Sequence, residues 1–487
     1  MPVFDDGDRG PSMWKRLLLG AALVIFASAS ATAVAAFGEV DRVVNALRTQ
    51  PELKLGADIA KTEAGKPQTI MLIGSDRRPK NNLEGAAADA RSDTIILVRL
   101  DPKKKATALM SLPRDLKVKI PGHGTDKINA AYSYGGPKLT LRTVTKVTGI
   151  DVNHVVNVDF KGFREAVNAL GCPYIDIDRR YFNDNSGYEP DYATIDVKPG
   201  YQKLCGHDAL DYVRYRHEDT DIVRAARQQE FLRQLKQQIG LTKLFERRQD
   251  LLDIFGKYTE SDIRGRANVL RLLKLALASA QHPIREIHFK GSIGVSYVTA
   301  TSAVMRDLRE DFLGLKATPG PRGHLNPKGK QKKEPVSGLE NAEVAGKDQA
   351  LQLAAMGQKL AKLPAFYPKL RTYGSLYAGP PRYYHIPVGP RADRTWYPAY
   401  RMVIKKGLIG EYYGIQGTTW KDPPALRDAS ETREIGGREY ELHFDGDRLR
   451  MVAWKTDKGV YWLQNTLLQT LTEQQMMAIA TSTKTLR

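Results

Sequence analysis

Short apolar runs recur through the first half of the chain at the length expected of buried β-strands. They lie at Thr69–Ile73, Thr94–Leu100, Ala106–Leu112, His154–Val158 and Tyr174–Ile177. Between the last two runs, Phe160–Leu170 repeats its apolar residues with the period of a helix and is followed by Gly171, which favours helix termination. We interpret residues 154–177 as a βαβ unit, and the mixture of strands and helices predicts an α/β fold.

Helical periodicity dominates the next part of the chain. It covers Ile222–Ile239 and returns near Leu244–Tyr258 and Ser261–Ala280. A basic stretch rich in Pro and Gly then predicts a linker. Beyond it, alternating strand signals and a terminal helix predict a smaller α+β domain. Its expected elements are Tyr400–Lys406, Leu408–Ile415, Glu439–Phe444, Arg448–Lys455, Gly459–Leu463 and the helix Thr472–Ser482.

An uncharged segment near the N-terminus, residues 17–37, is long enough to cross the hydrocarbon core of a membrane as a helix. Basic residues precede it and acidic residues follow it, which predicts a cytoplasmic N-terminus and an exported remainder. The expected protein is therefore a single-pass protein of the cell membrane. A cleaved signal peptide is the alternative, because Ala31-Thr32-Ala33 is similar to a cleavage site.

These signals divide the chain into parts with distinct roles. We expect a cytoplasmic tail (1–16), a transmembrane helix (17–37), a stalk (38–66), a catalytic domain (67–240), a helical extension (241–313), a linker (314–346) and an extracytoplasmic C-terminal domain (347–487). The last domain shows no catalytic constellation. For it, binding of a polymer is preferred over catalysis.

Composition narrows the classes of function. Lys and Arg total 74 against 55 Asp and Glu, and a formal net charge of +19 favours phosphate-rich or polyanionic partners. Export argues against nucleic acid as that partner. The only two cysteines, Cys172 and Cys205, exclude Cys-rich zinc sites and iron–sulfur clusters. In an exported protein they are candidates for a disulfide, with two buried free cysteines as the alternative.

Charged residues gather where the first predicted strands end. Antiparallel pairing of the second and third strands joins residues whose numbers sum to about 206, which places Asp93 opposite Pro113. Arg114 and Asp115 therefore arrive beside Asp93. The residues expected at this sheet edge are Asp76, Arg91, Asp93, Arg114 and Asp115.

A second charged group lies where the helix Ile222–Ile239 begins. We expect Asp221 to be its N-cap, and an extended Tyr212–His217 would turn two arginines to one face. The group comprises Arg214, Arg216, Asp221, Arg224, Arg227 and Gln228. Arginines at a helix N-terminus, where amides and the helix dipole add to their charge, predict an anion site. Surface ion pairs are the alternative interpretation.

The two groups together suit a diphosphate. Carboxylates without clustered Cys or His favour a hard cation such as Mg²⁺, which characteristically bridges carboxylates and a phosphate. Guanidinium groups supply bidentate contacts to the remaining phosphate oxygens. Phosphoryl transfer requires mainly positioning and charge neutralisation, so the enzyme needs no separate strong nucleophile.

The order and spacing of eight short motifs are specific. They are Gly74-Ser75-Asp76, Arg91-Ser92-Asp93-Thr94, Leu112-Pro113-Arg114-Asp115, Asp126–Tyr132, Tyr134-Gly135-Gly136, Asp159-Phe160, Tyr212–His217 and Arg224–Gln229. Over about Thr69–Ile239 they resemble the LytR–CpsA–Psr family of cell-envelope phosphotransferases, in its actinobacterial form.

The resemblance implies an α/β/α sandwich with a mixed central sheet. It implies a membrane-anchored enzyme that transfers a glycopolymer, such as teichoic acid, from a polyprenyl diphosphate carrier to peptidoglycan through a phosphodiester. Asp76 and Asp93 would hold Mg²⁺, and Asp93, Arg114 and Asp115 would be catalytic, with Asp93 or Asp115 taking the proton. The residues expected to bind or orient the diphosphate are Arg91, Arg114, Lys127, Arg214, Arg216, Asp221, Arg224, Arg227 and Gln228.

Two other functions fit the same residues. A hydrolase would release lipid phosphate or diphosphate into water without a glycan acceptor. A non-catalytic exported protein would bind polyanions through its basic surface, with strong dependence on salt and no turnover.

Overall fold

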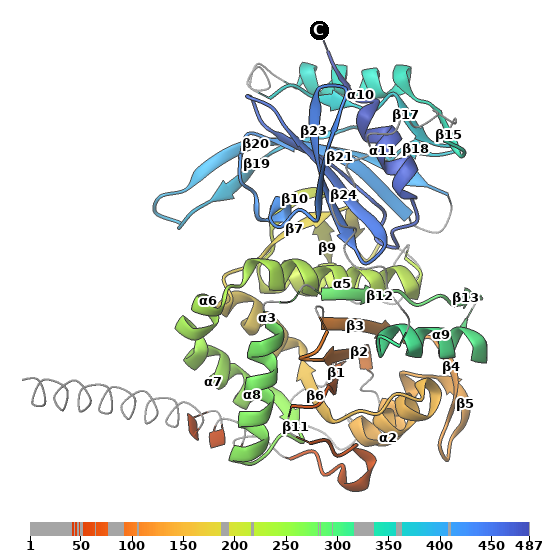
Figure 1. The fold of residues 1–487 in the computed structure, drawn as a ribbon, viewed down its shortest axis with the longest axis vertical. Helices are drawn as coiled ribbons and strands as arrows, with labels where there is room; N and C mark the ends of the chain where they lie inside the picture. Colours follow the sequence, from red (N-terminus) through yellow and green to blue (C-terminus); the bar gives the residue numbers. More distant parts are fainter. Residues whose placement is uncertain are drawn as a thin grey trace, which may run out of the picture.

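The structure, a computed structural model, describes most of the chain from residue 41 to residue 486 (Figure 1). Within that span it does not describe residues 43, 46, 47, 49–51, 64, 76–91, 105–106, 187–193, 216–218, 281, 283, 295, 316–335, 357–362 and 408–410. The predicted transmembrane segment, 17–37, lies outside the described residues. Among the helices that are described, none is both long and apolar enough to span a membrane.

A six-stranded mixed sheet forms the centre of the first lobe, in the order β11–β6–β1–β2–β3–β12. β6 runs parallel to β1 and β12 runs parallel to β3, whereas the other neighbours are antiparallel. The strands are β1 (Gln68–Ser75), β2 (Ser92–Leu100), β3 (Thr107–Leu112), β6 (His154–Asp159), β11 (Thr259–Ser261) and β12 (Ile284–Ile287). The mixed central sheet expected from the sequence is confirmed.

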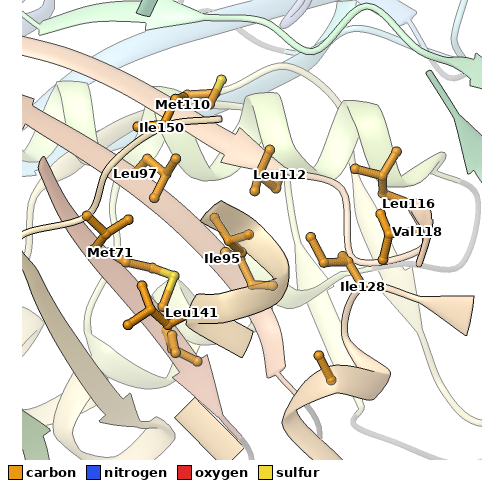
Figure 2. Packing of buried hydrophobic residues seen from close by; sticks show 14 of the residues in the cluster. Met71, Ile95, Leu97, Met110, Leu112, Leu116, Val118, Ile128, Leu141 and Ile150 are labelled. Carbon is orange, nitrogen blue, oxygen red and sulfur yellow. The ribbon is translucent and has the colours of Figure 1, made fainter. Parts of the chain in front are cut away.

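Helices cover both faces of this sheet, so that the lobe has three layers (Figure 1). Met110 of β3 points to one face, where it packs with Met71, Leu97 and Leu141 (Figure 2). The next residue, Ser111, points to the opposite face and donates a hydrogen bond to Gln228. The first face carries α2 (Ala130–Thr148) and α9 (Ser302–Phe312), and the second carries α5 (Asp221–Gln238) and α8 (Arg266–Ala280).

The β2–β3 hairpin is shifted by one residue from the expected register. Ile95 pairs with Leu112, so the paired numbers sum to 207 rather than 206. Asp93 is therefore level with Arg114 and not with Pro113. Against β1, Asp93 is the extra residue at an irregularity in the pairing, which is the pattern of a β-bulge.

The predicted βαβ unit is wrong. After α3 (Phe160–Ala169) the chain turns at Gly171 and Cys172, which both have positive φ. The next strand, β7 (Tyr174–Ile177), pairs antiparallel with β10 (Gly200–Lys203) and does not join the central sheet. Side chains of α5 hold this strand in place, since Gln234 accepts a hydrogen bond from the backbone N–H of Asp176.

A disulfide joins Cys172 and Cys205, whose Cα atoms are 4.5 Å apart. It connects the turn before β7 to the turn after β10. The remaining elements around it are β8 (Tyr181–Asn183), β9 (Ile195–Val197), α4 (Gly206–Arg214), α6 (Leu241–Glu246) and α7 (Arg248–Tyr258).

The second lobe is built on an eight-stranded antiparallel sheet with the path β18–β20–β21–β25–β24–β23–β22, and β19 also pairs with β20. The strands are β18 (Leu376–Tyr377), β19 (Arg382–Val388), β20 (Thr395–Lys406), β21 (Glu411–Thr418), β22 (Glu431–Ile435), β23 (Arg438–Asp445), β24 (Arg448–Lys455) and β25 (Val460–Gln464). α10 (Glu343–Ala355) and α11 (Glu473–Thr481) pack on one of its faces. The strand pairs and terminal helix expected from the sequence are present, but β19, β22 and α10 were missed.

Shorter elements complete the described chain. They are a 3₁₀ turn at Gly56–Asp58, β4 (Lys117–Ile120), β5 (Gly124–Lys127), β13 (Ser292–Ile293), β14 (Val298–Thr299), β15 (Leu339–Asn341), β16 (Phe366–Tyr367), β17 (Leu370–Thr372), a second 3₁₀ turn at Pro424–Leu426, and β26 (Lys484–Thr485).

A buried polar network attaches the second lobe to the first. Asp176 Oδ1 accepts hydrogen bonds from Arg401 (3.2 Å) and Gln416 (2.6 Å), and its Oδ2 accepts one from the indole N–H of Trp462 (2.8 Å). The side chains of Asp176 and Arg401 are 4% and 0% exposed. Tyr201 packs in an apolar cluster at the same interface. α5 consequently lies between the central sheet and the second lobe (Figure 1).

Candidate functional site

A cavity of about 310 Å³ opens where β3 ends and α5 begins. Its charged wall consists of Asp115, Lys127, Asp219, Thr220, Asp221 and Arg224. Its other wall is the β13–β14 hairpin, which contributes Ile293, Gly294, Ser296, Tyr297 and Val298.

A chain of ion pairs leads from Asp93 through Arg114 to Asp221, which lines the cavity. Arg114 Nη1 lies 2.6 Å from Asp93 Oδ1, and Arg114 Nε lies 3.9 Å from Asp221 Oδ1. Asp221 also forms an ion pair with Arg224. The side chains of Arg114, Asp221 and Arg224 are 11%, 4% and 5% exposed. Segments more than one hundred residues apart in the sequence therefore converge, as the sequence indicated for Asp93, Arg114 and Asp221.

Asp115 forms a second branch of the cluster. Its backbone N–H donates to Asp221 Oδ2 (3.1 Å), and its Oδ1 lies 2.8 Å from Lys127 Nζ. Lys127 ends β5, and the pairing of β5 with β4 fixes the position of this lysine. Among the described residues the site therefore holds four carboxylates, of Asp93, Asp115, Asp219 and Asp221, and three cations from four segments of the chain.

The N-terminus of α5 differs from the expectation in one respect. Thr220 is the N-cap, because its side chain accepts a hydrogen bond from the N–H of Val223. Asp221 is the first residue of the helix, where a carboxylate is stabilised by the helix dipole. Since Asp221 does not cap the helix, both of its oxygens are used at the site, toward Asp115, Arg114 and Arg224.

The two guanidinium groups of the site lie close enough to repel each other. Burial lowers the pKa of the Arg224 guanidinium, and the charge of Arg114 lowers it further, whereas Asp221 and the other carboxylates act in the opposite direction. Arg114 Nε is also buried without a hydrogen-bond partner among the described residues. An anionic oxygen placed between these groups would relieve the repulsion and satisfy this N–H.

Arg227 and Gln228 are not among the residues that line the cavity, and their described side-chain contacts are with the lobe itself. Arg227 is fully buried, forms an ion pair with Asp219 and donates to the backbone carbonyl of Tyr215. Gln228 donates to Thr94 Oγ1 (2.9 Å) and to a backbone carbonyl of α4. Both side chains therefore connect α5 to the segments packed around it.

The segment Tyr212–Arg214 is helical rather than extended, because α4 continues to Arg214. The Arg214 guanidinium lies over the ring of Phe160, 4.2 Å from its centroid. Three of the predicted site residues, Asp76, Arg91 and Arg216, lie outside the described residues.

The β13–β14 hairpin is the part of the site that sequence reasoning missed. Val298 donates its N–H to the carbonyl of Asp115 (2.9 Å), so the hairpin is attached to the charged loop itself. The Tyr297 ring lies 5.2 Å from Lys117 Nζ and 5.8 Å from Lys127 Nζ. Gly291 and Gly294 were the only turn signals in a stretch otherwise interpreted as part of a helical extension.

The donor set of this site fits Mg²⁺ in chemical terms. It offers carboxylate oxygens without a histidine or cysteine, and it offers guanidinium and ammonium groups for the other oxygens of a bound phosphate. Of the two predicted ligands, the described part of the chain includes Asp93 only, and Arg114 occupies one of its oxygens.

Comparisons with known proteins identify similar chains. A model of the LytR_cpsA_psr family matches residues 29–310. The polyisoprenyl-teichoic acid–peptidoglycan teichoic acid transferase TagT of Bacillus subtilis is 36% identical over 181 residues, which are 36% of this chain and 53% of that protein. The transferase of the same description named TagU from Enterococcus faecalis is 30% identical over 239 residues, 48% of this chain and 74% of that protein.

The chain spans about half the length of the first curated relatives that it matches. Among solved structures, one described as TagT bound to LIIa-WTA is 25% identical, with a TM-score of 0.43 over 54% of this chain and 98% of that chain.

Proposed function

Because the chain belongs to the LytR–CpsA–Psr family, we propose that it transfers a glycopolymer from a polyprenyl diphosphate carrier to peptidoglycan and leaves a phosphodiester. The names of TagT and TagU, teichoic acid transferases, support teichoic acid as the class of polymer. The observation that carries the proposal is one network of ion pairs and hydrogen bonds that joins Asp93, Arg114, Asp115, Asp221 and Arg224. Asp115, Asp221 and Arg224 of this network line the cavity.

In this reaction an acceptor hydroxyl attacks the phosphorus on the sugar side of the diphosphate. A new oxygen–phosphorus bond forms, the bond to the bridging oxygen breaks, and polyprenyl phosphate leaves. Arg114 and Arg224 bind and orient the phosphate oxygens, and the α5 N-terminus adds its partial positive charge. Asp115 accepts the hydroxyl proton, and Lys127 at 2.8 Å keeps its carboxylate oriented.

Asp76 and Asp93 are the proposed ligands of Mg²⁺, which would supply charge neutralisation at the diphosphate when bound. The uncharged segment 17–37 is the proposed membrane anchor, with the catalytic lobe outside the cell. This location would place the cavity on the same side of the membrane as the polymer and its acceptor.

Product analysis tests the proposed transfer. Purified protein is incubated with a polyprenyl diphosphate-linked glycan and Mg²⁺, with and without peptidoglycan. We expect polyprenyl phosphate and a glycan-linked peptidoglycan only when the acceptor is present. Equal release of the lipid without an acceptor would indicate the hydrolase instead. Binding without any product would indicate a polyanion-binding protein.

The Tyr297 ring is the proposed platform for a sugar of the acceptor. An aromatic contact of this kind is worth about 0.5–1.5 kcal/mol, or about two- to tenfold in affinity. We expect Tyr297→Ala to raise the KM for peptidoglycan by this factor and to leave kcat nearly unchanged. The matched Tyr297→Phe variant keeps the ring and should retain the KM of the wild type. A fall in kcat without a change in KM would contradict this role.

A further inference from the structure

Unpartnered polar atoms gather in a second place, at the junction of the two lobes. Glu286 and His288 lie at the end of β12, and Asp445 ends β23 of the second lobe. One ligand atom from each of these residues lies within 4.8 Å of the others, and Glu286 Oε2 is 3.7 Å from His288 Nε2. Arg233, which contacts this group, is nine residues along α5 from Arg224, about 13 Å at 1.5 Å per residue. The cluster is therefore separate from the cavity.

Glu286 and His288 carry buried polar atoms without a hydrogen-bond partner among the residues that the structure describes, whereas both carboxylate oxygens of Asp445 accept hydrogen bonds, Oδ1 from the Glu286 N–H and Oδ2 from Gln469. The side chains of Glu286 and His288 are 1% and 7% exposed. Glu286 Oε2 and both ring nitrogens of His288 have no hydrogen-bond partner within the described part of the chain. Gln469 donates to Asp445 Oδ2 (3.1 Å), but its own Oε1 is also unpartnered. Each such atom costs about 1–3 kcal/mol, so several at one point indicate a group that is bound there.

The neighbouring arginines do not satisfy these atoms. Arg233 forms ion pairs with Glu230 and with Oε1 of Glu286 (3.0 Å), which leaves Oε2 of Glu286 facing His288. Burial and the charge of Arg233 lower the pKa of Arg450 to about 10. Both ring nitrogens of His288 lack a hydrogen-bond partner among the described residues, and a neutral imidazole there would offer a lone pair to a bound cation.

We propose that Glu286, His288 and Asp445 bind a divalent transition-metal cation of the zinc class between the two lobes. One imidazole nitrogen with two carboxylates is a donor set that zinc accepts, whereas Ca²⁺ and Mg²⁺ prefer oxygen alone. In a tetrahedron with bonds of about 2.0–2.1 Å the donor atoms are about 3.4 Å apart, close to the 3.7 Å between Glu286 Oε2 and His288 Nε2.

The zinc content of the full-length protein, measured as zinc ions per chain, tests the proposal. The protein is stripped with a chelator, dialysed against Zn²⁺ and analysed by mass spectrometry for bound metal. We expect one zinc per chain and a higher Tm than that of the stripped protein. His288→Ala and Asp445→Asn should each weaken zinc binding by at least the roughly 10–100-fold that loss of an outer partner costs. The matched control His385→Ala, an exposed histidine on β19, should bind zinc like the wild type.

A measurement on the unmodified chain decides the case even if these variants fail to fold. Crystals of the zinc-treated protein should show anomalous density between Glu286, His288 and Asp445. The proposal is overturned if the wild type retains no zinc after dialysis, or if the anomalous density lies elsewhere. It is equally overturned if folded His288→Ala binds as much zinc as the wild type.

Discussion

Replacing Arg114 with Ala is expected to lower the rate of glycopolymer transfer by about 10²–10³-fold, the usual loss when one charge-stabilising donor is removed from a reaction site. Arg114 is nearly buried, contacts Asp93 at 2.6 Å and keeps an unpartnered N–H at the site. Its loss removes a positive charge where the diphosphate develops negative charge. The measurement is the rate of polyprenyl phosphate release with a saturating glycan acceptor.

Arg142→Ala is the matched control for this prediction. Arg142 also forms an Arg–Asp pair, with its Nε 2.7 Å from Asp58 Oδ1. Its side chain is half exposed, however, and Arg142 does not line the cavity. Its loss should leave transfer unchanged. If folded Arg114→Ala retains a rate within threefold of the Arg142→Ala variant, the proposed role of Arg114 is wrong.

Asp176→Ala should destabilise the protein by about 3–5 kcal/mol, because it leaves the guanidinium of Arg401 buried and uncompensated. It also removes the acceptor for Gln416 and Trp462. Denaturant unfolding, followed by tryptophan fluorescence, measures the change. Trp462 donates directly to Asp176, so its emission reports the opening of this interface.

Asp196→Ala supplies the comparison for the interface. Asp196 pairs with Arg180 at 2.7 Å, and the two side chains are both well exposed. Removal of such a pair costs at most about 1 kcal/mol. Equal destabilisation by the two substitutions would show that the lobes are not held by the buried network.

The sequence predicted that the charged segments come together, but it predicted the strand register and the helix start between them less accurately. The register of the β2–β3 hairpin was off by one residue, because the turn could be located only approximately from its Pro and Lys residues. Thr220 and Asp221 are both good capping residues, and only the extended backbone of Thr220 decides between them. Both predictions were wrong by a single residue, so the paired residues changed while the site stayed at the same edge of the sheet.

The larger errors in the prediction concern segments whose position is set by tertiary contacts. Tyr174–Ile177 has the composition of a buried strand, but it is buried by α5 and the second lobe and not by the central sheet. Arg227 was expected near the anion because helical spacing relates it to Arg224. Spacing does not reveal that Asp219 and the carbonyl of Tyr215 bind Arg227 inside the lobe. The β13–β14 hairpin is too short to show a periodic pattern.

The position of Trp462 makes completion of the first lobe depend on the last part of the chain. During synthesis, Asp176 emerges long before Arg401, Gln416 and Trp462, its three side-chain partners. Until they arrive, the carboxylate of Asp176 lacks these partners and stays exposed to water, although β10 and α5 already hold the strand that carries it. A premature stop codon ahead of Trp462 should thus mark the product for proteolysis, even though every catalytic group has already been translated.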